Sequence, residues 1–157
     1  MHIMPIVKNK LFFTLIVILT FTGCSATGDF SLFKSSNKPD ASLFARIGGL
    51  PVLTKIVDEF IDKVATTPST KRSFEGIKLK TLKESVVLHL CELTGGGCKY
   101  EGETMANSHR DAKITEAEFD AFVSMFRDTL NQYVNTREKN ELLKILAPMK
   151  RDIVTPI

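Results

Sequence analysis

The chain has 157 residues, a length that suits one domain with a short additional segment. Its 21 lysines and arginines stand against 18 acidic residues, which gives a formal net charge of +3. Basic stripes with interleaved aromatic residues are absent from the sequence, which argues against a nucleic-acid-binding protein.

The first 23 residues predict an export signal. Lys8 and Lys10 form a basic region, and residues 11–21 form an apolar run. This run is too short to span a bilayer, which needs roughly 20 apolar residues, and suits the apolar region of a signal peptide. Cleavage before Cys24 leaves 19 basic residues of the original 21 against 18 acidic ones, so the mature chain is nearly neutral.

The run ends at Phe21-Thr22-Gly23-Cys24, which resembles a bacterial lipobox and implies that Cys24 is lipidated. An ordinary secretory signal and an uncleaved membrane anchor are the alternatives. Ser25 after the cysteine favours sorting to the outer membrane. We expect residues 24–41 to be a lipidated tether, and residues 42–157 a domain in the periplasm or at the cell surface.

The domain shows helix patterns and no persuasive strand pattern or repeat. The first helix is expected from Pro51, a residue suited to a first helical turn, and breaks at residues 67–70. Leucine and valine spacings of three and four predict a second helix over residues 79–93, and residues 95–97 are three glycines that end it. We therefore predict an all-α fold.

Three further helical segments are expected toward the C-terminus. A short helical turn covers about residues 105–110. Thr115 and Glu118 form a capping box, which opens a helix with a broad apolar stripe. A last helix starts near Arg137 and breaks near Pro148.

Lipidation of Cys24 leaves Cys91 and Cys98 in the mature chain. In an exported protein an even pair favours a disulfide, and the intervening glycines let the chain fold back. Two free thiols are the alternative reading. The sequence lacks Cys-x-x-Cys-His, so covalent c-type haem attachment is not indicated.

His109 is the first candidate for chemistry. It lies four residues after Met105, five before Ile114 and ten before Phe119, a spacing that suits an imidazole held over an apolar pocket. A surface or hydrogen-bonded core histidine is the alternative. The domain is also rich in phenylalanine, which either fills a core or lines a flat aromatic ligand.

Several motifs in chain order resemble group I truncated haemoglobins. They are Leu43-Phe44-Ala45-Arg46-Ile47-Gly48-Gly49, Asp58-Glu59-Phe60, Phe74-Glu75-Gly76, Gly95-Gly96, Tyr100-Glu101-Gly102, Met105 with His109, Ile114 and Phe119, and Ile145-Leu146-Ala147-Pro148. The resemblance covers residues 42–153 and implies a two-over-two helical sandwich around haem b.

Within that resemblance, His109 matches the proximal iron ligand, and a neutral imidazole suits iron. Phe74 matches the aromatic residue packed against the haem, and Phe60 matches a residue of the distal side; a role in the core alone is the alternative for both. Met105, Ile114 and Phe119 match the proximal segment.

The distal side departs from the family pattern. Ile61 stands where relatives carry a ligand-stabilising tyrosine, and Leu82 and Val86 stand where relatives often have a polar group. Bound O2 gains from such donors, whereas NO and CO need them less. The resemblance with these changes implies a globin that binds a diatomic gas (O2, NO or CO) without tight O2 storage.

His89 shares the helix face of Leu82 and Val86. It could approach the haem edge, donate to a propionate, reach the iron, or remain a partly exposed helix histidine. Lys78, Lys83, Arg110 and Lys113 are candidate partners of the propionates, or simply surface charges.

Oxidation of NO is a further activity that such a globin could have. It requires an external electron donor, because the sequence has no flavin or dinucleotide motif, and it is not assigned. Two other readings stay open: a haem-free globin-like lipoprotein that acts as an interaction module, and a helical adaptor unrelated to globins.

Overall fold

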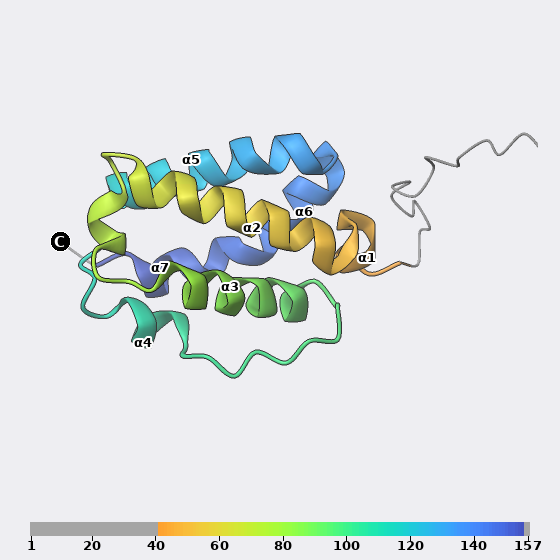
Figure 1. Cartoon of the computed structure of the whole chain (residues 1–157), viewed down its shortest axis with the longest axis horizontal. Helices are drawn as coiled ribbons and strands as arrows, with labels where there is room; N and C mark the ends of the chain where they lie inside the picture. Colours follow the sequence, from red (N-terminus) through yellow and green to blue (C-terminus); the bar gives the residue numbers. More distant parts are fainter. Residues whose placement is uncertain (1–40, 156–157) are drawn as a thin grey trace, which may run out of the picture. The chain divides into compact units, whose positions relative to one another are not determined.

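The computed structural model describes residues 41–155, which belong to one compact unit, Ser31–Ile157. The helical elements are α1 (Leu43–Ile47), α2 (Gly49–Thr66), η1 (Lys71–Phe74), α3 (Leu79–Leu93), α4 (Met105–His109), α5 (Glu116–Tyr133), α6 (Thr136–Leu146), η2 (Ala147–Met149) and α7 (Lys150–Ile153), as Figure 1 shows. The predicted signal peptide, Cys24 and the tether up to residue 40 lie outside the described residues.

The described residues confirm the all-α prediction. Their one β-type pairing is an isolated parallel bridge between Ile114 and Val154. None of their helices combines the length and apolar character needed to span a membrane.

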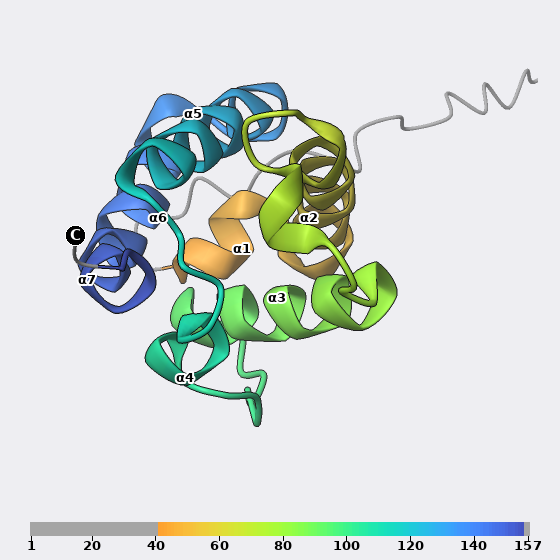
Figure 2. The same ribbon diagram turned by 90° about the vertical axis from the view of Figure 1, so that its left-hand side faces the viewer.

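Helix α2 is the centre of the packing. It contacts α3 on one side and α5 on the other, and α5 in turn contacts α6 (Figure 1). The pairs α2–α3 and α5–α6 are the two layers of the sandwich. The short helix α4 lies away from α2 and packs against α7 (Figure 2).

The turn between α1 and α2 depends on a glycine. Ser42 opens α1, its Oγ accepting from the Ala45 amide at 3.3 Å. Gly48 ends the helix with φ at 112°, a left-handed conformation that favours glycine. A Cβ at Gly48 would lie 2.6 Å from Cγ2 of Val52. Only glycine therefore lets α2 follow α1 without a linker.

The predicted helices agree with the observed ones. Helix α3 has the predicted bounds, and the capping box of Thr115 and Glu118 is present at the start of α5. Near Pro148 the α6 helix gives way to a 3₁₀ turn, as expected from the missing amide of proline. Helices α1 and η1 were not predicted as helices, because five and four residues are too few to show a periodic pattern.

A single apolar core joins these elements. Its members have at most 9% of their surface exposed and come from α1, α2, α3, α5 and α6. Its largest fully buried side chains include Leu53, Ile56, Leu130 and Leu142. Burial of each such side chain stabilises the fold by about 1.5–3 kcal/mol.

One buried ion pair links the first and last parts of the domain. The guanidinium of Arg46 on α1 lies 3.4 Å from a carboxylate oxygen of Glu138 on α6, and both side chains are almost fully covered. Arg46 also bonds to Glu141, which is half exposed. Glu141 is the main cause that raises the pKa of Arg46, so the guanidinium stays charged.

The disulfide predicted between Cys91 and Cys98 is present. The two Cα atoms lie 5.7 Å apart, and Cys91 is fully buried. A Cβ at Gly96 would lie 2.5 Å from the Cys91 Sγ and 2.7 Å from the Phe44 ring. The glycine run therefore lets the chain pass close to the sulfur as well as turn.

Candidate functional site

His109 is held at the end of α4 by its own helix. Its Nδ1 lies 2.8 Å from the Met105 carbonyl oxygen and 3.0 Å from the Ser108 Oγ. Since a carbonyl oxygen only accepts, Nδ1 must carry the proton of the neutral ring. The lone pair is therefore on Nε2, the nitrogen that remains to bind a metal ion.

Helix α4 is short, and its start is fixed by a cap. The Thr104 Oγ1 accepts from the Asn107 amide at 3.2 Å, and Ser108 donates to the Thr104 carbonyl at 2.9 Å. These bonds fix the start of a five-residue helix, and its packing against α7 adds to them.

The segment that follows His109 is tied to distant parts of the chain. Arg72 of η1 donates to the carbonyls of Ala112 and Lys113 at 3.3 and 3.2 Å. The amide of Thr155 donates to the Ile114 carbonyl at 2.9 Å. The segment that follows His109 is therefore held both by η1 and by the segment after α7.

Arg72 also makes a two-pronged bond to Glu118, with N–O distances of 2.9 and 2.8 Å. The hydrogen bond from the Thr115 backbone, and then the bonds from the Thr115 side chain and Arg72, hold the pKa of Glu118 below its usual value. Glu118 is thus an ionised carboxylate that caps α5 and holds Arg72 in place.

Five of the nine candidate haem-lining residues meet in the apolar core. Phe60 and Ile61 on α2 are 3% and 2% exposed, and Phe74, Leu82 and Val86 are partly buried against the same cluster. The Phe60 ring packs against Phe122 and Phe126, with centroids 4.6 and 4.7 Å away. Phe60 therefore has a core role, which the sequence left open as the alternative.

The other four candidates lie outside that core. Met105, His109, Ile114 and Phe119 are all partly buried, and they come from α4, the segment after it and the first turn of α5. Half-covered apolar side chains are expected where a flat apolar group completes the packing. The role of all nine residues in binding such a group stays a prediction.

His89 on α3 is a partly buried polar residue whose role the sequence left open. Both of its ring nitrogens are buried without a hydrogen-bond partner, and its ring packs on Tyr100 with centroids 4.5 Å apart. Burial lowers the pKa of the imidazole, and the charge of Glu92 opposes this in part. His89 is thus a neutral imidazole at neutral pH.

Comparison with known proteins identifies the family. The family model described as bacterial-like globin matches residues 42–155, essentially the whole described domain. This chain belongs to the bacterial-like globin family.

Relatives of this globin are group 1 truncated haemoglobins. One from Mycolicibacterium paratuberculosis is 28% identical over 116 residues, 73% of this chain and 85% of that protein. One from Chlamydomonas moewusii is 27% identical over 116 residues, 72% of this chain and 68% of that protein.

Solved structures agree on the fold. The Fe(III) form of truncated haemoglobin from Tetrahymena pyriformis has a TM-score of 0.70 at 22% identity, and the match covers 74% of this chain and all of that chain. The 2/2 haemoglobin of a Synechococcus, solved with covalently attached haem, has a TM-score of 0.68 at 23% identity, with 73% and 98% covered. The predicted two-over-two globin fold is confirmed.

Haem b is the cofactor of this family, and the residues of this globin fit it. The predicted ligand His109 has its Nδ1 bonded to the Met105 carbonyl, which leaves Nε2 for a metal ion, and the predicted lining residues Met105, Ile114 and Phe119 are half-covered apolar side chains. A metal held by protein side chains alone is not indicated, since no three His, Cys, Asp or Glu side chains gather suitably within residues 41–155.

Two of the proposed propionate partners are engaged elsewhere. Lys83 bridges Asp62 at 2.8 Å and Asp58 at 3.7 Å, so it ties α3 to α2. Arg110 donates to the Asn107 side chain at 2.5 Å. Lys83 and Arg110 would have to give up these bonds in order to pair with haem propionates.

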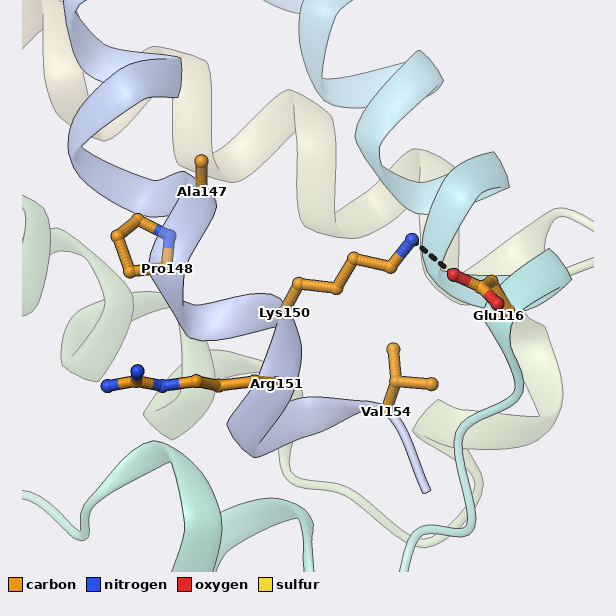
Figure 3. A pocket seen from close by; sticks show the side chains of 6 residues that line it. All are labelled: Glu116, Ala147, Pro148, Lys150, Arg151 and Val154. Atoms are coloured by element: carbon orange, nitrogen blue, oxygen red, sulfur yellow. Dashed lines mark ion pairs between the residues drawn. The ribbon is translucent and has the colours of Figure 1, made fainter. Parts of the chain in front are cut away.

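Two surface pockets of the described residues are lined by other residues. One, of about 500 Å³, is lined by Glu116, Ala147, Pro148, Lys150, Arg151 and Val154, and Figure 3 shows Lys150 reaching across it to Glu116. The other lies between the outer sides of α2 and α3. Neither is lined by any of the nine candidates.

Proposed function

We propose that this globin holds haem b through Nε2 of His109 and reversibly binds a diatomic gas, O2, NO or CO, at the iron. The observation that carries the proposal is the bond between His109 Nδ1 and the Met105 carbonyl, at 2.8 Å. It fixes the tautomer that ligates a metal through Nε2 and fixes the orientation of the ring. A single axial histidine leaves the opposite side of the iron open to a gas.

The side chains predicted for the distal side favour gases that need no hydrogen-bond donor. Ile61, Leu82 and Val86 are apolar, and Ile61 is fully buried among apolar neighbours. Hydrogen bonds to a charged acceptor contribute about 1.5–3 kcal/mol, and O2 bound to ferrous iron develops such charge. These three side chains offer O2 no donor, and the lack of such a bond speeds O2 escape about 10- to 100-fold, so they favour NO and CO relative to O2.

The spectrum of the full chain supplied with haem tests this function. The parent is expected to show a Soret band, and His109→Ala to lose the ferrous histidine-ligated spectrum. Asn107→Ala, an exposed change on the same helix, is the matched control and should keep the parent spectrum. A parent without a Soret band, or His109→Ala with an unchanged ferrous spectrum, contradicts the proposal.

We further propose that the globin domain works outside the cytoplasm, tethered by a lipid on Cys24, with the outer membrane favoured. The lipobox-like Phe21-Thr22-Gly23-Cys24 and the Cys91–Cys98 disulfide support this, because disulfides persist in oxidising compartments.

Labelling with a radioactive fatty acid in a Gram-negative host tests the anchor. The parent is expected to take up the label and fractionate with membranes, and Cys24→Ser to do neither. Cys98→Ser serves as the control for loss of a cysteine and should still be labelled. A Cys24→Ser variant labelled as strongly as the parent rules out this lipidation site.

A further inference from the structure

His89 is a polar residue of the described domain that has no assigned role. It lies on α3, three residues after Val86 and seven after Leu82. At 100° per residue these three side chains fall within about 60° of one another around the helix. His89 thus extends the face that is predicted to cover the distal side of the haem. This inference rests on the proposed function.

The ring nitrogens of His89 need a partner that residues 41–155 do not supply. Both are buried without a hydrogen bond, although a neutral imidazole has one N–H donor and one acceptor nitrogen. Buried polar groups are nearly always hydrogen-bonded, and those that are not call for an explanation. A group that enters the domain from outside would satisfy this requirement.

Tyr100 covers His89 but does not bond to it. Their rings pack with centroids 4.5 Å apart, while the Tyr100 hydroxyl donates to the Glu103 carbonyl at 2.9 Å. The disulfide of Cys91 and Cys98 stands two residues inside this pair and holds the loop against α3. The imidazole is therefore held by packing against Tyr100, and its buried nitrogens remain without a hydrogen bond within residues 41–155.

We propose that His89 is the polar residue of the haem pocket, and that its N–H donates a hydrogen bond to an oxygen atom that arrives with the haem. Two sources carry such an oxygen: a haem propionate carboxylate and an O2 molecule held at the distal face. In both cases the imidazole supplies a polar contact that Ile61, Leu82 and Val86 lack. His89 then sets how firmly the pocket holds haem or how slowly it releases O2.

His89→Phe in the full chain loaded with haem tests this, because it keeps a ring against Tyr100 and removes the nitrogens. We expect haem transfer to an acceptor apoprotein, or O2 dissociation, to become about 10- to 100-fold faster. Haem dimethyl ester separates the sources: it abolishes the difference between parent and variant if the partner is a propionate, and preserves it if the partner is O2. Leu88→Phe, an exposed change on the same turn, should alter neither rate.

Two results would overturn the proposal. One is a folded, haem-loaded His89→Phe whose haem-transfer and O2-dissociation rates both lie within about twofold of the parent. The other comes from the unaltered protein. Nitrogen NMR of the diamagnetic O2 form, which holds both oxygen sources, should show a His89 N–H that exchanges slowly with water, and one that exchanges as fast as in the haem-free chain contradicts the bond. A missing Soret band would instead indicate failure of the haem proposal itself.

Discussion

His109 and Met105 show how a helix can select the chemistry of one of its own side chains. The 2.8 Å bond to the Met105 carbonyl favours the tautomer with the proton on Nδ1, and this leaves the lone pair of Nε2 to act as a ligand. The sequence spacing of these residues, with the family resemblance, predicts His109 as the iron ligand, and that role stays a prediction. It could not predict the tautomer, because that depends on the hydrogen bond made by the folded helix.

Ile61 gives the most direct test of the distal argument. Ile61→Tyr adds a hydroxyl where relatives carry one, and should slow O2 dissociation by about 10- to 100-fold. Stopped-flow mixing with excess CO measures this rate. Ile61 is 2% exposed, so the larger ring also strains the core, by about 1–3 kcal/mol.

Ile61→Phe has the same ring without the hydroxyl and is therefore the matched control. If the missing donor controls O2 release, the tyrosine variant should release O2 more slowly than the phenylalanine variant. Equal rates in the two variants would show that ring size, and not the missing donor, controls O2 release.

His89 predicts a pH dependence of folding in the haem-free protein. Burial lowers its pKa in the folded state, so the unfolded state binds the proton more tightly. The free energy of unfolding is therefore at its full value above the unfolded pKa of about 6.5 and falls as the pH drops below it. The charge of Glu92 raises the pKa of His89 and so makes this loss of stability smaller. Glu118, whose pKa is lowered in the folded state, reduces the free energy of unfolding only at lower pH, below its usual pKa of 4.5.

Urea unfolding of the haem-free chain at pH 7 and pH 5.5 measures this dependence. The parent should lose stability between these values, and His89→Phe should lose less. A parent and variant with the same loss would place the titrating group elsewhere.

At the scale of the elements, the predictable helices are those with a local signal at both ends. Helix α3 starts after Lys78 and ends before three glycines, and its leucines repeat at helical spacing, so its bounds could be predicted. The capping box marked the start of α5. The left-handed Gly48 that separates α1 from α2 gave no such signal, because its role depends on Val52 one helical turn later.

The disulfide joins the end of α3 to the loop that leads to α4. It closes a loop with a sequence separation of 7 residues, for which chain entropy predicts a stabilisation of about 2–3 kcal/mol. Dithiothreitol should lower the urea midpoint of the parent accordingly. The double variant Cys91→Ser, Cys98→Ser should show no response to the reductant, and a parent that also shows none would contradict the contribution of this bond.

At the scale of the whole domain, the contacts that sequence patterns could not reveal are those between distant charged residues. Arg72 and Glu118 are 46 residues apart, and Arg46 and Glu141 are 95 apart. Local periodicity carries no information on such pairs. They bring η1 to the segment after His109 and α1 to α6, and so define how the predicted helices assemble.

Arg46 should accordingly be the most sensitive charged residue for folding. Arg46→Ala leaves Glu138 buried at 4% side-chain exposure without its partner. Removal of one partner of a buried ion pair costs about 3–5 kcal/mol. Urea unfolding measures the loss, and Arg151→Ala, at a side chain 81% exposed, is the control and should change stability by at most about 0.5 kcal/mol. Equal losses in the two variants would contradict a structural role for the buried pair.

The central claim is that His109 ligates haem iron, and chemical rescue tests it most directly. His109→Gly removes the imidazole and leaves room for a free one, so ferrous spectra of the haem-loaded variant should be recorded with and without added imidazole. The account predicts that the variant loses the parent spectrum and that imidazole restores it. A variant whose ferrous spectrum equals that of the parent before any imidazole is added would contradict the claim.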